Sequence, residues 1–222
     1  MLSAFDYLND TLLAFVAILP VVNPFSKPPI FLSITEGWSN EERRAEAFKA
    51  SLYAFIILLV SLVAGTFILK FFAISLPALQ IAGGLLIART AFQMLNPQPQ
   101  HHQTDDEKRD ACTREDISFV PLAMPLLAGP GSMAVMINLA TEVKFWAEWV
   151  IYSIAALAVA VISYFVLAES VRFARFMGVN GMNAMSKLMG FLLLALAVQF
   201  MISGAEAALT TLVQHLNSLP AD

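Results

Sequence analysis

The amino-acid sequence predicts an all-α membrane protein whose six transmembrane helices form two inverted three-helix repeats. Three observations lead to this fold class. First, 58% of the 222 residues are hydrophobic and only 14% are charged, whereas soluble domains carry about 25% charged residues. Second, the hydrophobic residues gather in blocks of roughly 20, the length at which a helix crosses the hydrocarbon core of a bilayer. Third, the first and fourth blocks are each interrupted by proline-containing clusters.

The hydrophobic blocks define six predicted spans separated by polar segments. They lie at about residues 10–34, 50–69, 76–95, 119–140, 149–168 and 186–208. Residues 1–95 are expected to form the first three-helix repeat, 96–117 a cytoplasmic linker loop and 118–222 the second repeat. Either interrupted span could instead be a re-entrant segment. The N-terminus has no basic stretch before its apolar residues, so we expect the first span to be retained rather than cleaved as a signal peptide.

Prolines account for the interruption of both spans. In the first, three prolines within six residues (Pro24, Pro28 and Pro29) remove backbone donors and clash with helical carbonyl groups. In the fourth, residues 124–132 contain two prolines and two glycines. A helix that breaks inside a membrane has to satisfy the freed amide and carbonyl groups within protein or cavity water. We therefore expect both helices to be broken in mid-membrane, in surroundings lined by protein.

The two halves of the chain carry their breaks at matching positions. A shift of 106 residues places residues 23–26 (Asn-Pro-Phe-Ser) over residues 129–132 (Gly-Pro-Gly-Ser). Each half has three spans, an odd number, so the second half is inserted in the opposite orientation. This is the inverted-repeat arrangement of secondary transporters, in which interrupted helices at corresponding positions point to the binding site.

Basic residues in the loops predict the orientation of the chain, since they favour the cytoplasmic side. Eight of them lie in loops on one side of the membrane: Arg43, Arg44, Lys49, Lys108, Arg109, Arg114, Arg172 and Arg175. Only Lys70 and Lys144 lie in loops on the other side. The asymmetry predicts that both termini face outward.

The two breaks are also the predicted substrate site. A helix N-terminus attracts a carboxylate and a C-terminal carbonyl end attracts an ammonium group or a cation, so two facing breaks suit a zwitterion. The residues expected to bind it are Asn23, Pro24, Ser26, Gly129, Pro130, Gly131 and Ser132. The alternative is that proline and glycine only kink these helices for packing, because both are frequent in membrane helices.

Five further side chains are candidates for the cavity or its gate: Lys27, Arg89, Gln93, Lys187 and Gln199. Lys27 lies inside the first break, where a charge must face an aqueous path or the interface. Arg89 and Lys187 lie near the cytoplasmic ends of their spans and could instead snorkel to the headgroups. The two glutamines could hydrogen-bond between helices. No carboxylate lies in mid-span, so the sequence assigns no coupling ion.

Close helix packing is expected at three glycines of the third and sixth spans, Gly83, Gly84 and Gly190. A small residue lets neighbouring helix backbones approach closely in a membrane. We expect these glycines to bring the third and sixth helices close to the broken ones.

Composition and motifs argue against several other functions. A net charge of −4 and an isoelectric point near 5.3 provide no cationic surface for nucleic acid. The single cysteine, Cys112, excludes an internal disulfide and a multi-cysteine metal site. His101 and His102 are better interpreted as part of a solvated loop than as metal ligands. No nucleophile–base pair is visible, so we expect no enzyme activity, no cofactor and no metal.

Several motifs resemble those of the MarC family of six-span bacterial inner-membrane proteins, and the resemblance covers essentially the whole chain. The most specific are Asn23-Pro24 followed by Pro29-Ile30-Phe31, Ile81-Ala82-Gly83-Gly84, Val120-Pro121-Leu122-Ala123-Met124-Pro125 leading into Ala128-Gly129-Pro130-Gly131, and Leu188-Met189-Gly190 with Gln199. The plan of the family is similar to that of the lysine-exporter superfamily, and one branch is regarded as transporters of glycine and alanine. The resemblance implies a bacterial inner-membrane location and transport of small neutral amino acids.

Three residues depart from the family pattern. Ser26 replaces a glycine that is common in relatives, Lys27 adds a charge beside it, and Lys187 stands where arginine is more usual. These departures bear on the identity of the substrate more than on the fold.

The leading hypothesis is a secondary transporter of a small polar metabolite, whose partners are that small molecule, the lipid bilayer and a coupling ion, either a proton or Na⁺. One alternative is a structural or regulatory membrane protein whose breaks only shape packing. Another is drug efflux, as the family name suggests, which would need a broad cavity lined by aromatic or methionine side chains. A hydrated cavity lined by both breaks would favour transport. An oligomer is compatible with the sequence.

Overall fold

The computed structural model describes residues 4–96, 117–143 and 145–217, and every regular element within these ranges is a helix. Most of the predicted linker, with His101, His102 and Cys112, lies outside the described residues. The elements in chain order are α1 (Ala4–Val22), η1 (Pro24–Ser26), α2 (Pro28–Ile34), α3 (Asn40–Phe71), α4 (Leu76–Leu95), η2 (Ser118–Leu127), α6 (Pro130–Glu142), α7 (Trp146–Ala168) and α8 (Ser170–Asn217).

Five stretches of the described chain are long and apolar enough to cross a membrane, and a bent pair makes a sixth if it counts as one span. The bent pair is η2 with α6, which meet at 65°. The helical path is also interrupted after α1, where η1 and α2 follow as short separate pieces. All six stretches overlap the predicted spans, and both interruptions fall at the predicted proline clusters.

Two helices begin earlier than hydropathy alone predicts. α3 starts at Asn40 rather than near residue 50, because Ser39 and Glu42 form a capping box. The Ser39 hydroxyl accepts the Glu42 N–H at 3.3 Å, and the Glu42 carboxylate accepts the Ser39 N–H at 2.7 Å. α8 likewise starts at Ser170, and it bends at Gly178, whose φ of 62° is a left-handed conformation that glycine tolerates.

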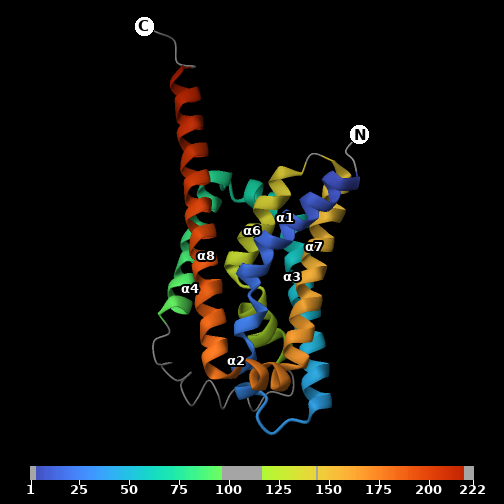
Figure 1. Ribbon diagram of the computed structural model, residues 1–222. Helices are drawn as coiled ribbons and strands as arrows, with labels where there is room; N and C mark the ends of the chain where they lie inside the picture. Colours follow the sequence, from blue (N-terminus) through green and yellow to red (C-terminus); the bar gives the residue numbers. More distant parts are fainter. Residues whose placement is uncertain (1–3, 97–116, 144, 218–222) are drawn as a thin grey trace.

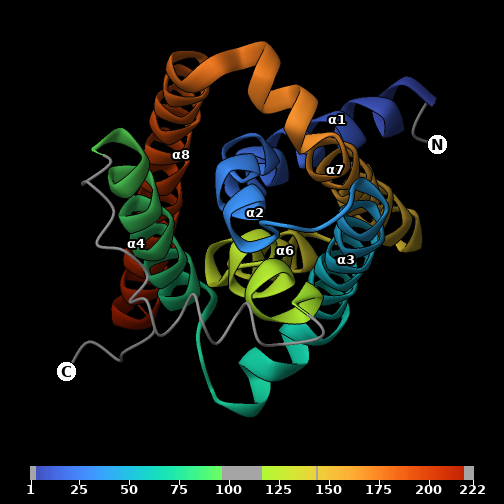
Figure 2. The same ribbon diagram turned by 90° about the horizontal axis from the view of Figure 1, so that it is seen from below.

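The long helices run roughly along one direction, and the start of α1 and the end of α8 lie toward the same end of the bundle (Figure 1). Seen along that direction, α4 and α8 form a pair on one side, while α3 and α7 lie on the other (Figure 2). α6 packs against both α3 and α4, so the broken span lies between the two groups.

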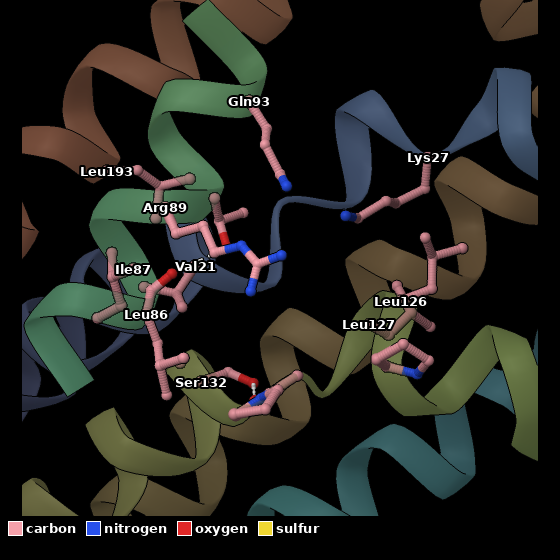
Figure 3. A pocket seen from close by; sticks show the side chains of 15 residues that line it. Val21, Lys27, Leu86, Ile87, Arg89, Gln93, Leu126, Leu127, Ser132 and Leu193 are labelled. Carbon is pink, nitrogen blue, oxygen red and sulfur yellow. Dashed lines mark hydrogen bonds between the residues drawn. The ribbon is translucent and has the colours of Figure 1, made fainter. Parts of the chain in front are cut away.

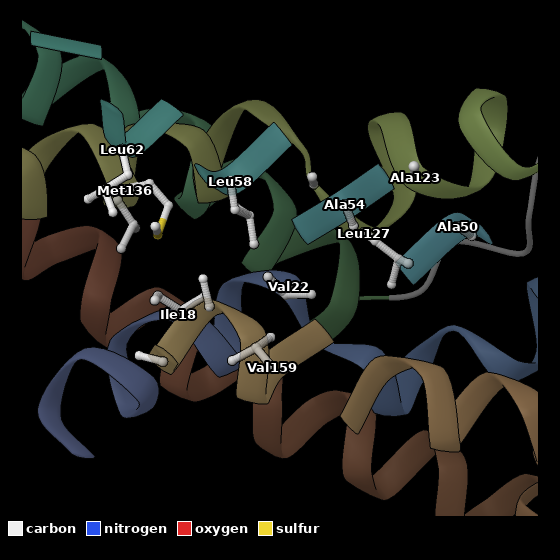
Figure 4. Packing of buried hydrophobic residues seen from close by; sticks show 14 of the residues in the cluster. Ile18, Val22, Ala50, Ala54, Leu58, Leu62, Ala123, Leu127, Met136 and Val159 are labelled. Carbon is white, nitrogen blue, oxygen red and sulfur yellow. The ribbon is translucent and has the colours of Figure 1, made fainter. Parts of the chain in front are cut away.

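The buried core holds the two breaks in place. Its side chains come from α1, α3, η2, α6 and α7 and meet between these elements (Figure 4): Ile18, Val22, Leu58, Leu62, Leu127, Met136 and Val159. Val22 and Leu127 stand directly before the first and the second break and are 2% and 1% exposed. Because lipid tails are as apolar as these side chains, the core stabilises the fold through close packing rather than through transfer out of water.

An ion cluster joins the start of α3 to the junction of α7 and α8. Arg44 and Arg172 both donate hydrogen bonds to the Glu169 carboxylate, the second at 2.7 Å. The hydrogen bond from Arg44 is the main reason that the pKa of Glu169 lies below its ordinary value. Since Arg44 and Arg172 come from two predicted cytoplasmic loops, the cluster brings those loops together at one end of the bundle.

Glycines allow the closest helix approaches in the bundle. A Cβ at Gly84 would lie 2.8 Å from the Ala197 carbonyl oxygen of α8, and a Cβ at Gly190 would lie 3.2 Å from a carbonyl oxygen of α4. A Cβ at Gly83 would lie 2.8 Å from Ala134 of α6. Gly83 therefore lies against the broken span, whereas Gly84 and Gly190 pack α4 against α8 and not against a broken helix as predicted. Successive residues of a helix point about 100° apart, so adjacent glycines face different neighbours.

Replacing Gly84 with leucine should destabilise the protein. The new side chain would overlap the α8 backbone, and overpacking of this kind typically costs about 1–3 kcal/mol. Thermal unfolding of the purified protein in detergent should show a lower midpoint for Gly84→Leu than for the wild type. Ala82→Leu is the matched control, because Ala82 is exposed on the same helix. An equal midpoint for the two variants would show that α4 and α8 do not depend on this contact.

Candidate functional site

The first break is shaped by Asn23. Its backbone is left-handed (φ 45°, ψ 67°), a conformation that asparagine adopts more readily than other residues with a Cβ. Its N–H still donates to the Leu19 carbonyl at 2.8 Å, while its Nδ2 donates to Ser26 Oγ at 2.7 Å and to Met94 Sδ of α4 at 3.4 Å. Asn23 is only 1% exposed. Its side chain therefore fixes the turn instead of facing an open space.

The helix that follows the first break begins with two residues that have no amide donor. α2 starts with Pro28 and Pro29, and proline has no N–H. The residue before them, Lys27, is half-buried and belongs to the turn between η1 and α2. The first turn of α2 therefore offers fewer amides than that of α6, and Lys27 places an ammonium group beside it.

The second break ends in a helix start that does offer amides. Gly129 precedes α6 in extended conformation, and no side chain caps this end. The Ser132 hydroxyl and the Met133 N–H both donate to the Gly129 carbonyl, at 2.8 and 3.1 Å. The N–H groups of Gly131 and Ser132 lie in the first turn and have no acceptor within the helix. These amides and the positive end of the helix dipole favour a negative charge in front of α6.

A cavity of about 410 Å³ lies between the two breaks. It is lined by Val21, Lys27, Leu86, Ile87, Arg89, Thr90, Gln93, Pro125, Leu126, Leu127, Gly129, Pro130, Gly131, Ser132 and Leu193. The polar ends of Lys27, Arg89 and Gln93 point toward the same space, with Ser132 at its border (Figure 3). The cavity thus collects residues from both breaks and from α4, with Leu193 of α8 closing one side.

Among the described residues of this wall, the charged ones are all positive. Lys27 and Arg89 line the cavity, and none of the described lining residues is an aspartate or glutamate. Within the described part of the chain, neither cation forms an ion pair; the ion pairs found there involve Arg44, Lys49 and Arg172. Arg89 is exposed and Lys27 is half-buried, and together the two cations raise the electrostatic potential in the cavity.

The structure brings together some of the predicted site residues and separates others. Gly129, Pro130, Gly131 and Ser132 line the cavity, as do the three predicted gate residues Lys27, Arg89 and Gln93. Asn23, Pro24 and Ser26 are not part of its wall; Asn23 and Pro24 are buried and Ser26 is half-buried. Lys187 and Gln199 are exposed on α8, outside the wall. Gln199 donates to Ser203 one turn along its own helix, at 3.4 Å.

Sequence reasoning missed the apolar wall and Thr90. Leu86, Arg89, Thr90 and Gln93 are spaced three or four residues apart and therefore share one face of α4. This spacing could have pointed to Thr90 and Leu86 once Arg89 and Gln93 were candidates. Leu193 carried no such signal, because its contribution depends on how α8 packs against α4.

Comparison with known proteins gives the family of the chain. A family model described as the MarC family of integral membrane proteins matches residues 8–209. The chain belongs to the MarC family. Its MarC-family relatives include the inner membrane protein MarC of Salmonella typhimurium, 40% identical over 210 residues, which cover 90% of this chain and 95% of the relative.

Further MarC relatives have a similar sequence identity to this chain. The inner membrane protein MarC of Citrobacter koseri is 39% identical over 210 residues, covering 90% of this chain and 95% of the relative. The protein of that name from Escherichia coli O1:K1 is 39% identical over 203 residues, covering 86% and 92%. No solved structure matches this MarC-family chain.

Substitutions at Asn23 should separate the role of its backbone from that of its side chain. Asn23→Ala forces alanine into a left-handed conformation, at about 1–2 kcal/mol, and removes the hydrogen bond to Ser26, worth about 1 kcal/mol. Asn23→Gly loses only the hydrogen bond, because glycine tolerates a positive φ. Thermal unfolding midpoints in detergent should fall in the order wild type, glycine, alanine. An alanine variant as stable as the glycine variant would contradict a role for the left-handed turn.

Proposed function

We propose that this protein is a secondary transporter that moves a small polar solute by alternating access through the cavity between its two breaks. The observation that carries the proposal is the cavity itself: its wall combines Lys27 from the first break, the first turn of α6 from the second, and Arg89 from α4. Interrupted helices that meet at a polar cavity are the usual design of substrate sites in secondary transporters. A purely structural role would not require converging polar groups there.

An inverted repeat is part of this proposal. Each half of the chain begins with an interrupted span, α1 with η1 and α2 in the first and η2 with α6 in the second. Each interrupted span is followed by two long helices, α3 and α4 or α7 and α8. With three spans in each half, the halves would cross the membrane in opposite directions, and their interface would contain the cavity.

The proposed location is the bacterial inner membrane, with both termini in the periplasm. The relatives at 39–40% identity are named inner membrane proteins. The Arg44–Glu169–Arg172 cluster gathers basic residues at one end of the bundle, and basic loops favour the cytoplasm. A proton or Na⁺ gradient is the proposed source of energy.

The family resemblance implies glycine and alanine as first candidate substrates, and a cavity of about 410 Å³ has room for either. Drug efflux is less well supported. The described residues of the cavity wall include no aromatic or methionine side chain, whereas drug-sized ligands generally bind in pockets lined by hydrophobic and aromatic groups.

Alternating access can be tested without knowing the substrate. In a Cys112→Ser background, a cysteine replacing Ser132 should react with a small membrane-impermeant thiol reagent from both sides of the membrane, in right-side-out and in inverted vesicles. Lys70→Cys and Arg175→Cys serve as markers for the two sides. Both residues are exposed, Lys70 in the last turn of α3 and Arg175 near the start of α8, and these two helix ends lie at opposite ends of the bundle (Figure 1). Ala82→Cys, on the outer face of α4, should react from neither side. Labelling of position 132 from one side alone would rule out alternating access.

Uptake of radiolabelled glycine and alanine into proteoliposomes tests the candidate substrates, with and without a proton or Na⁺ gradient. Any saturable uptake should be abolished by Gly131→Leu, because a Cβ there already lies 3.0 Å from Ile87 and a longer side chain would enter the cavity. Ala82→Leu should leave uptake unchanged. Uptake that persists in Gly131→Leu would place the transport path elsewhere.

A further inference from the structure

We infer that the cavity selects small solutes with a net negative charge, above all carboxylates that carry no ammonium group. The inference rests on the proposed function, because it concerns the solute that binds in the same cavity. It differs from the expectation of a zwitterion, for which one break would hold the carboxylate and the other the ammonium group.

The charge of the wall is the first argument. The side chains of Lys27 and Arg89 approach the cavity from opposite sides, one from the turn before α2 and the other from α4 (Figure 3). None of the described residues that line the cavity is acidic. The buried acid Glu46 does not line the cavity, and its carboxylate accepts hydrogen bonds from the Ile117 N–H at 2.9 Å and from Lys49 at 3.4 Å.

The supply of hydrogen-bond donors is the second argument. The first-turn amides of Gly131 and Ser132 and the side-chain amide of Gln93 add donors to the two cations. The Ser132 hydroxyl directs its hydrogen to the Gly129 carbonyl at 2.8 Å, so this carbonyl already accepts a bond. Two cations and several N–H groups match the oxygens of a carboxylate, since charge-assisted hydrogen bonds are the strongest that proteins form.

The absence of a carboxylate that could pair with an ammonium group, among the described residues of the wall, is the third argument. A zwitterion in this cavity would place its positive charge near Lys27 and Arg89, with no carboxylate in the described wall to offset it. Repulsion between like charges grows as the effective dielectric constant falls. A net-negative solute would instead neutralise the wall.

Alanine and lactate provide a matched pair of probes, because they differ by an ammonium group in place of a hydroxyl. Binding to the purified wild-type protein should be measured in detergent by isothermal titration calorimetry, with succinate and inorganic phosphate as further probes. Lactate or succinate should bind at least tenfold more tightly than alanine. Preferred binding of phosphate would assign the site to phosphate-bearing anions, which also supports selection by negative charge. Equal or tighter binding of alanine, or binding of none of these anions, would overturn the inference.

Charge variants test whether the two cations cause the selectivity. Lys27→Met and Arg89→Gln should each weaken binding of the preferred anion at least tenfold, while Lys27→Arg and Arg89→Lys should retain most of it. Lys187→Met is the control, since Lys187 is exposed outside the wall. Unchanged affinity in both neutral variants, with folding verified by thermal unfolding, would refute the assignment. Anion binding without two-sided labelling at position 132 would remove transport but keep the site.

Discussion

The backbone of a membrane-embedded helix cannot be interrupted unless every freed amide and carbonyl group finds a partner, and this constraint organises the structure around its two breaks. At the first break, the Asn23 N–H extends the hydrogen bonds of α1 to Leu19, and prolines at the start of α2 have no N–H to satisfy. At the second, the Ala128 N–H donates to Ala123 at 2.8 Å. At the start of α6, the amides of Gly131 and Ser132 have no acceptor within the helix. These residues line the cavity, where water or a ligand can accept their hydrogen bonds.

The two breaks differ in how they satisfy or remove the backbone N–H groups that an interrupted helix leaves free. The first is rigid and closed: Asn23 is buried, its side chain bonds to Ser26 across the turn, and Pro28 and Pro29 remove donors. The second is open, with Gly129 leaving the helix start uncapped. The first break therefore contributes a positively charged side chain, Lys27, to the cavity wall, whereas the second contributes backbone amides. Any pseudo-symmetry between the halves concerns the path of the chain rather than its electrostatics.

This division explains what the sequence could and could not predict. Proline has a fixed effect on backbone hydrogen bonding, so both breaks were predictable from Pro24, Pro28, Pro29 and Pro130. The role of Asn23 was not, because only the fold shows that its side chain turns into the protein. Arg89 was equally consistent with snorkelling, and its place in the wall depends on packing of α4 against α6 and α8. The early start of α3 is encoded locally by the capping box of Ser39 and Glu42. Hydropathy does not detect it, because both residues are polar.

The charge of the cavity follows from the same reasoning and bears on its purpose. An unpaired cation within a membrane protein is costly, and proteins keep one there where it lies on a path for a substrate or ion. Here two cations from separate parts of the chain face one space, and the buried acid of α3, Glu46, accepts a hydrogen bond from the Ile117 N–H, directly before η2. Packing alone does not account for this arrangement, because apolar side chains would fill the space at lower cost. The proposed ligand, with compensating charge, would account for it by supplying the counter-charge.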